Sequence, residues 1–153
     1  MQMLETKIPP PLLFVAVGAA MWGVGRVAQP IHLAEAVRLP LTGGFLLVAL
    51  ALAGPAFLEF RRTGTTIDPI RPENASTMVT SGIYRITRNP MYVGLTALLL
   101  GWAVWLSVPW ALAGPVFFAV YLNRLQIIPE ERAMAGKFGR SYELYRQHVR
   151  RWL

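Results

Sequence analysis

The stretch "MYVGLTALLLGWAVWLSVPWALAGPVFFAVYLN", from Met91 to Asn123, contains no charged residue. As a single helix it would be about 50 Å long, whereas the hydrocarbon core of a bilayer is about 30 Å thick. A proline disfavours the helical conformation in the residue before it, so Pro109 marks a break within the stretch. The sequence therefore predicts a helical hairpin in a membrane, with one arm at 90–107 and the other at 109–128.

Two earlier stretches, 11–28 and 41–60, are also apolar, apart from Arg26 and Glu59. The whole chain is 54% hydrophobic and 15% charged, with a mean hydropathy of +0.42. A soluble domain would disperse its apolar residues among charged faces, whereas here they lie in blocks. We expect an all-α integral membrane protein that forms a single domain over 1–153, with about four transmembrane helices.

The basic residues predict how the helices are oriented. With four spans and the N-terminus inside, twelve of the fifteen Lys and Arg residues fall in the inner segments, and Arg124 lies near the inner end of the arm 109–128. Only Arg26 and Arg38 lie elsewhere. By the positive-inside rule, the loop 61–89, the tail 129–153 and both termini lie in the cytoplasm. The basic residues flank the spans, so the net charge of +7 indicates contact with anionic membrane lipids rather than with nucleic acid.

The tail 129–153 has the pattern of an amphipathic, interfacial helical segment. Apolar residues recur in it at spacings of three and four, and six basic residues lie among them. Gly136 and Gly139 weaken a helix, so two shorter helices that meet near Phe138 are expected. The chain has no cysteine, and its two histidines, His32 and His148, are far apart. We therefore expect no metal site.

A polar motif, "SGIYRITRNPMYVG", directly precedes the hairpin, and Glu130-Glu131 directly follows it. A hairpin returns its two ends to the same side of the membrane, so Arg88 should lie close to the two acids. Charged groups at such a depth are costly unless they are paired or used. The acids and Arg88 form either a structural ion pair or the lining of a polar pocket, and the sequence leaves both open.

Two motifs, "MVTSGIYRITRNPMYVG" and "PEERAMAGKFGRSYELY", resemble the signature of the isoprenylcysteine carboxyl methyltransferase family and the related membrane phospholipid methyltransferases. The similarity is to the compact bacterial members and extends from Gly64 to Trp152. It implies an integral membrane methyltransferase, in the bacterial inner membrane, that uses S-adenosylmethionine. The expected pocket lies at the cytosolic end of the last helices, beneath the C-terminal segment.

The resemblance also implies roles for individual residues. Arg88 would lie near the reacting group, and Glu131 could assist an amine acceptor. Gln126 occupies the position where the eukaryotic carboxyl methyltransferases have an arginine, thought to meet the substrate carboxylate. The residues expected to bind the cofactor are Thr77, Met78, Val79, Tyr84, Asn89, Pro90, Met91, Tyr92 and Glu130.

Two positions depart from the pattern of the family. Asn89 replaces a histidine; an amide can hydrogen-bond but cannot titrate, so a role as a base is lost. Gln126 replaces the arginine. The expected substrate is therefore a lipophilic small molecule or lipid, and the sequence does not decide whether the acceptor is a thiol, carboxylate, amine or lipid. It does not indicate the oligomeric state either.

Three other functions fit part of the sequence. A membrane reductase with a nicotinamide cofactor is one, because sterol reductases share a related carboxy-terminal arrangement. A small multidrug-type transporter would also have four helices, but it would need an acid deep in the first span, where this chain has Arg26. A catalytically altered relative is the third, on account of Asn89.

Overall fold

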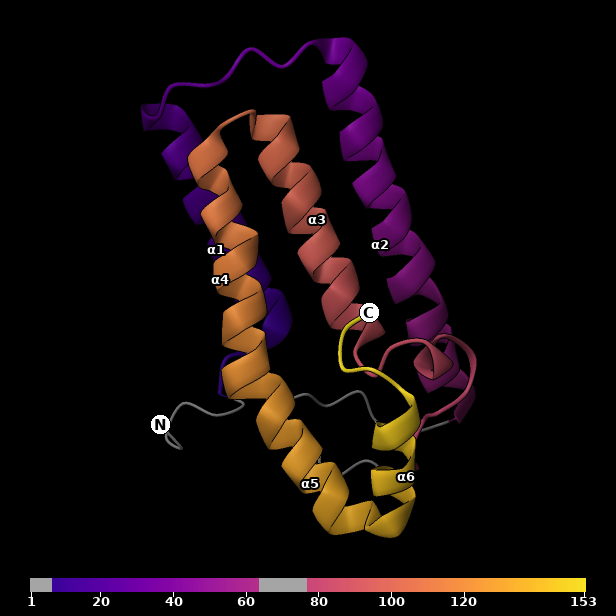
Figure 1. Ribbon diagram of the computed structural model, residues 1–153. Coiled ribbons are helices and arrows are strands. Elements are labelled where there is room, and N and C mark those ends of the chain that lie inside the picture. The colour runs from indigo at the N-terminus through magenta and orange to yellow at the C-terminus, as the bar shows by residue number, and fades with distance from the viewer. Residues whose placement is uncertain (1–6, 64–76) are drawn as a thin grey trace.

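A computed structural model of the protein describes residues 7–63 and 77–153. In these residues the chain is helical, with no strand beyond one isolated parallel bridge between Thr87 and Arg150 (Figure 1). In chain order the elements are α1 (Pro10–Val27), α2 (Glu35–Thr63), η3 (Gly82–Arg85), α3 (Pro90–Leu106), η4 (Pro109–Leu112), α4 (Ala113–Tyr121), η5 (Leu122–Ile127), α5 (Ile128–Phe138) and α6 (Arg140–His148). Here η3 and η4 are 3-10 turns and η5 is a π-helical turn.

Three helical stretches are long and apolar enough to cross a membrane. They are Pro10–Val27, Glu35–Glu59 and Pro109–Phe138 among the described residues. The expectation of an all-helical membrane protein is thereby confirmed. Helix α3 is also apolar, but with 17 residues it is shorter than each of these three stretches. A fourth span therefore stays a prediction, as does the placement of the termini.

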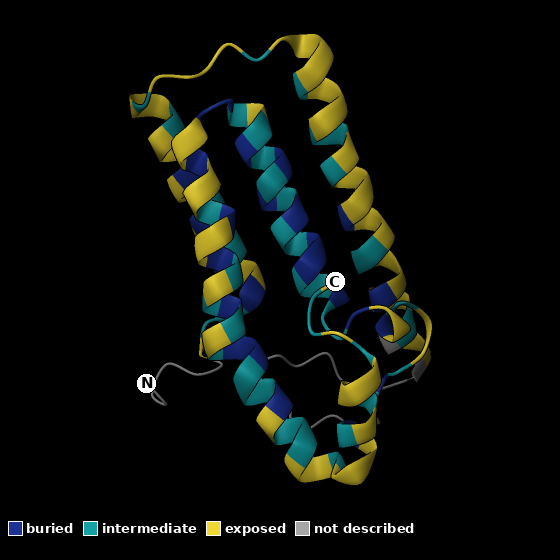
Figure 2. Cartoon of the chain, in the orientation of Figure 1, coloured by how far each residue is buried: buried dark blue, intermediate teal, exposed yellow. Residues whose placement is uncertain are grey.

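Exposed positions follow the outer faces of α1, α2 and α4 (Figure 2), and many of them hold large apolar side chains, as a lipid-facing surface should. Leu47 on α2 is 69% exposed and Val116 on α4 is 63% exposed. By contrast, α3 is largely buried between the other helices. The main core joins α1, α3 and α4 through buried side chains such as Val17, Leu99 and Phe118. Side chains are thus apolar both inside and outside, which is the pattern of a protein solvated by hydrocarbon.

The predicted break in the hairpin is confirmed. Ser107 ends α3 in the left-handed conformation, with φ 55°, and its N–H donates to the carbonyl groups of Ala103 and Val104. Val108 is extended, as expected before a proline, and Pro109 begins η4. The chain therefore reverses within a few residues, and α4 returns alongside α3 (Figure 1).

The last helix extends further than the predicted span of 109–128. The helical stretch that begins at Pro109 continues through Pro129 and ends at Phe138. A proline ring crowds the preceding turn of a regular helix, but the wider π turn η5 lies directly before it and relieves that crowding. The expected break in the tail is confirmed, because Gly139, with φ 51°, separates α5 from α6.

The second helix also differs from its predicted bounds of 41–60. It begins at Glu35 and includes Pro40 and Pro55 within its length. The predicted loop 61–89 begins inside this helix, which ends at Thr63. Residues 64–76 of that loop lie outside the described residues.

Gly94 allows α2 and α3 to pack closely. A Cβ atom at this position would lie 3.1 Å from the Ala53 Cβ and 3.2 Å from the Ala49 carbonyl oxygen. We therefore expect Gly94→Leu to lower the stability by about 1–3 kcal/mol, because overpacking would push the two helices apart. Thermal unfolding in detergent would measure this. Gly54→Leu is the matched control, since nothing lies within 4 Å of a Cβ there; equal loss in both variants would contradict the expectation.

Candidate active site

The two sequence motifs meet at the end of the bundle where α3 begins (Figure 1). Pro90 is the first residue of α3, where its missing N–H is not needed. The helical stretch Pro109–Phe138, which we call the last rod, continues past the start of α3 as α5. Helix α6 then turns back toward the bundle. The final residues, 149–153, which we call the C-terminal strap, lie against the start of α3 and against α5.

Glu130 lies at the centre of a small hydrogen-bonded group. The Tyr92 hydroxyl donates to Glu130 Oε1 at 2.7 Å, and the Gln126 amide donates to the same oxygen at 2.6 Å. Gln126 is almost completely buried, at 1% exposure, and lies in the π turn η5. Both bonds from described residues fall on Oε1, and within 7–63 and 77–153 no residue donates a hydrogen bond to Oε2.

Glu131, the next residue, has different partners. Arg88 Nη2 lies 2.6 Å from Glu131 Oε1. Arg151 forms a fork on the same carboxylate, with Nη2 at 2.6 Å from Oε2 and Nε at 2.9 Å from Oε1. Arg151 Nη1 also donates to Asn123 Oδ1 at 3.1 Å. The side chains of Arg88 and Glu131 are 9% and 10% exposed, so this is a nearly buried, fully paired carboxylate.

The residues from Thr87 to Asn89 bind the backbone of the strap. The Arg88 N–H donates to the Arg150 carbonyl, and Arg88 Nη1 donates to the Val149 carbonyl at 3.0 Å. The Asn89 side-chain amide donates to the Arg151 carbonyl at 2.9 Å, and the Thr87 hydroxyl donates to the same oxygen at 3.3 Å. The polar residues before α3 therefore act, in part, as a cradle for the end of the chain.

An apolar and aromatic wall adjoins this polar group. Val79 and Tyr84 are buried with Ala56 of α2, and Met91 packs against them. The Tyr145 hydroxyl of α6 donates to the Tyr84 carbonyl at 2.6 Å, which ties α6 to η3. Burial raises the pKa of the Tyr84 and Tyr145 phenols well above the ordinary value, so both remain protonated at neutral pH.

The structure brings most of the predicted site residues to one end of the bundle. The pairing of Arg88 with an acid is found, and the partner is Glu131. Thr77 is exposed and Met78 is half-buried, and neither belongs to the two carboxylate networks described above. The other predicted site residues all lie at this end of the bundle: Val79, Tyr84, Arg88, Asn89, Pro90, Met91, Tyr92, Gln126, Glu130 and Glu131.

Two residues of the site were not singled out from the sequence. Asn123 is a polar residue at the end of an uncharged run, and that position could have drawn attention to it. Arg151 is one of several arginines near the C-terminus, and no local pattern distinguishes it. Within residues 7–63 and 77–153, no cluster of three His, Cys, Asp or Glu side chains could hold a metal ion.

Comparisons with known proteins agree with the two motifs. Residues 37–141 match the phospholipid methyltransferase family. An uncharacterized protein of Haemophilus influenzae is 43% identical over 63 residues, which are 41% of this chain and 100% of that protein. Protein-S-isoprenylcysteine O-methyltransferase B of Arabidopsis thaliana is 35% identical over 97 residues, which are 61% of this chain and 48% of the plant enzyme.

The match thus spans about half the length of the plant enzyme. No solved structure matches the chain significantly. The family match covers more than half of the chain and includes α3, the last membrane helix, α5 and the acidic pair. On this evidence, and with the membrane-type helices that the structure shows, the chain belongs to the phospholipid methyltransferase family.

Proposed function

We propose that this protein transfers a methyl group from S-adenosylmethionine to a lipophilic or amphipathic acceptor at the cytoplasmic face of the membrane. Family membership supports methyl transfer in a membrane. The cofactor and the acceptor class are those that the family resemblance implies, and the residues around Glu130 support the cofactor.

The observation that most favours the cofactor is the state of Glu130. Tyr92 and Gln126 hold one oxygen of its carboxylate at a fixed position, and the other oxygen accepts no hydrogen bond from a described residue. A carboxylate presented in this way suits a cationic partner, and the cofactor has both an ammonium and a sulfonium group. Bound there, it would supply an electrophilic methyl group.

The wall beside Glu130 suits the adenine ring of the same cofactor. Val79, Tyr84 and Met91 offer aromatic and aliphatic surface next to the acid. We include Thr77 and Met78 as further contacts, because they lead directly into this wall. Methyl transfer is an in-line displacement, so the task of these residues is to align the reactants and to exclude water.

The roles proposed for Arg88, Glu131 and Asn89 follow from their contacts. Both oxygens of Glu131 are bonded by guanidinium groups, so we assign it and Arg88 to holding the site together rather than to proton transfer. The Asn89 amide donates to the strap. An asparagine suffices for that bond, and the absence of an imidazole need not prevent methyl transfer to an acceptor that reacts without a base.

The cytoplasmic location is also a proposal. The site lies at the end of the bundle where α2 ends and α3 begins (Figure 1). Arg62 is in the last turn of α2, and Arg88 and Arg151 pair with Glu131 at this end. Arg26 is in the last turn of α1 and Arg38 lies near the start of α2, at the other end. By the positive-inside rule we propose that the site and both termini lie in the cytoplasm. The family resemblance supports a bacterial inner membrane as the location.

The test is calorimetric titration of the detergent-purified protein with S-adenosylhomocysteine, and separately with oxidised and reduced nicotinamide cofactors. We expect saturable binding of S-adenosylhomocysteine alone. Incubation with a labelled methyl donor and a membrane lipid extract should then label an organic-soluble product. Binding of a nicotinamide cofactor instead would favour the membrane reductase. A well-folded sample that binds neither would leave only a catalytically altered relative.

A further inference from the structure

The C-terminal strap is bound along its backbone. The carbonyl groups of Val149, Arg150 and Arg151 each accept a hydrogen bond from the segment between Thr87 and Asn89. Each such bond contributes only about 0.5–1.5 kcal/mol to stability. A nearly buried contact between charged groups would hold the strap more firmly than these bonds do.

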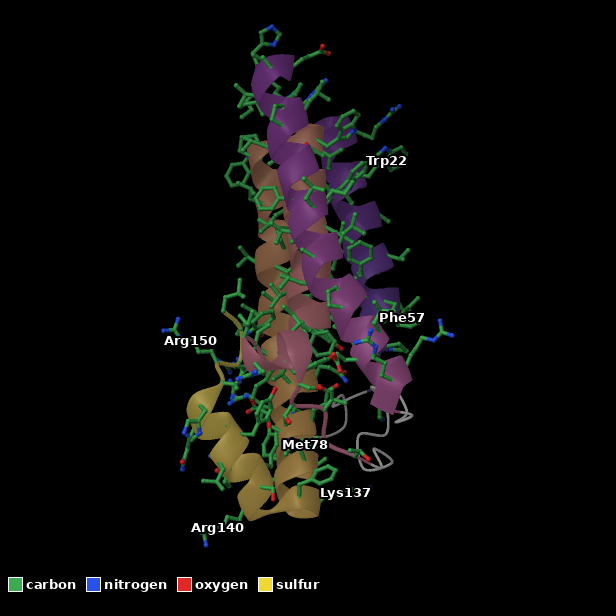
Figure 3. All side chains as sticks on the ribbon, turned by 90° about the vertical axis from the view of Figure 1, so that its right-hand side faces the viewer. Trp22, Phe57, Met78, Lys137, Arg140 and Arg150 are labelled. Carbon is green, nitrogen blue, oxygen red and sulfur yellow. The ribbon has the colours of Figure 1, made fainter. Side chains whose placement is uncertain are left out.

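Arg151 provides that attachment. Its guanidinium contacts both oxygens of Glu131 and the Asn123 side chain, and thus joins the strap to two helical turns of the last rod. The neighbouring Arg150 is exposed, and Figure 3 shows it pointing away from the bundle. The side chains of these two adjacent arginines therefore lie in different surroundings, Arg151 against the last rod and Arg150 away from the bundle.

The strap also adjoins the Glu130 group. Trp152 packs against the same apolar cluster as Tyr92, whose hydroxyl holds Glu130. Leu153 is 62% exposed and lies at the level of the start of α3 (Figure 1). The strap thus adjoins both the Glu130 group and the apolar core of the bundle.

We propose that Arg151 is a positioning residue, which locks the C-terminal strap between α3 and α5 through Glu131 and Asn123 and so completes the wall of the cofactor site. The effect on cofactor affinity rests on the proposed function. The attachment of the strap does not, because it is argued from the contacts of Arg151 with Glu131 and Asn123.

The absence of cysteine makes a direct test of the strap feasible. Spin labels at Leu153→Cys and Phe117→Cys, both at exposed positions, would report the distance between the strap and α4 by pulsed electron resonance. We expect one narrow distance distribution in the parent and a broad one with Arg151→Gln. Arg150→Gln, which removes the same charge one residue away, should leave the distribution narrow.

The affinity for S-adenosylhomocysteine separates positioning from general stability. If Arg151→Gln leaves the strap in place only about a tenth of the time, the affinity should fall about tenfold, while the binding stoichiometry stays the same. Arg151→Lys keeps the charge but not the fork, so part of the affinity should return. A purely structural role would lower the melting temperature without changing the affinity of the folded protein.

Two results would overturn the proposal: a distance distribution that Arg151→Gln leaves narrow, or a loosened strap with unchanged affinity. If the parent does not bind S-adenosylhomocysteine, the proposed function is wrong, and the distance measurement alone decides whether Arg151 locks the strap.

Discussion

Replacing Glu130 with glutamine should weaken the binding of S-adenosylhomocysteine by at least about tenfold. Glutamine has almost the same volume, and its side-chain oxygen can still accept the bond from Tyr92. What is lost is the negative charge that faces the cationic part of the ligand. A hydrogen bond to a charged group is worth about 1.5–3 kcal/mol, which corresponds to roughly a 10- to 150-fold weaker affinity.

Calorimetric titration of the purified variant would measure this loss. The control is Glu143→Gln on α6, which also removes one carboxylate but only breaks a half-exposed pair with Arg146. Its affinity should equal that of the parent. A Glu130→Gln protein that binds S-adenosylhomocysteine with parental affinity would rule out Glu130 as the cofactor's carboxylate.

Replacing the adjacent Glu131 with glutamine should instead destabilise the fold, by about 3 kcal/mol. Two guanidinium groups would lose their anionic partner, and the side chain of Arg88 is only 9% exposed. Removing one member of a buried ion pair leaves an uncompensated charge in a poorly solvated place, and this costs about 3–5 kcal/mol. We take the lower end because the side chain of Arg151 is 34% exposed.

Thermal unfolding in detergent would show the effect as a lowered melting temperature. Glu35→Gln is the control, since Glu35 is exposed and lies 3.4 Å from Arg38, so its loss should change little. In the double variant Glu131→Gln/Arg151→Gln, the losses should be less than additive, because both changes break the same contact. Full additivity would show that Arg151 and Glu131 do not stabilise each other.

These predictions give neighbouring carboxylates opposite roles, one in binding and one in stability. Glu130 and Glu131 are equally placed in the sequence after the hairpin, and either could have paired with Arg88. Adjacent residues on a helix point about 100° apart, so the choice depends on the rotation of the last rod about its axis. The π turn η5 contributes to that rotation, and no residue pattern in "LNRLQI" predicts a π turn.

Much of the fold follows from local properties of the sequence. Apolar runs predict membrane helices because each buried residue contributes its own transfer free energy, and Pro109 and Gly139 interrupt helices through their own backbone geometry. The meeting of the two motifs follows as well, because a hairpin must return its ends to one side. The family resemblance, which rests on those motifs, is confirmed.

Other features depend on contacts between residues that are distant in the sequence. Helix α2 includes Pro40 and Pro55, and the last helix continues through Pro129, although prolines usually end helices. The assignment of Arg88 to Glu131, and of Arg151 to the same carboxylate, requires the strap to fold back over the start of α3.

By itself, then, the sequence determined the membrane-helical class, the hairpin break and the end of the bundle at which the site lies, because these depend on local hydrophobicity and backbone chemistry. Only the tertiary structure decided which carboxylate is paired, which arginine of the tail is buried against it and where the strap lies. Those outcomes depend on helix rotation and on the return of the chain's end, and neither is encoded in a short stretch of residues.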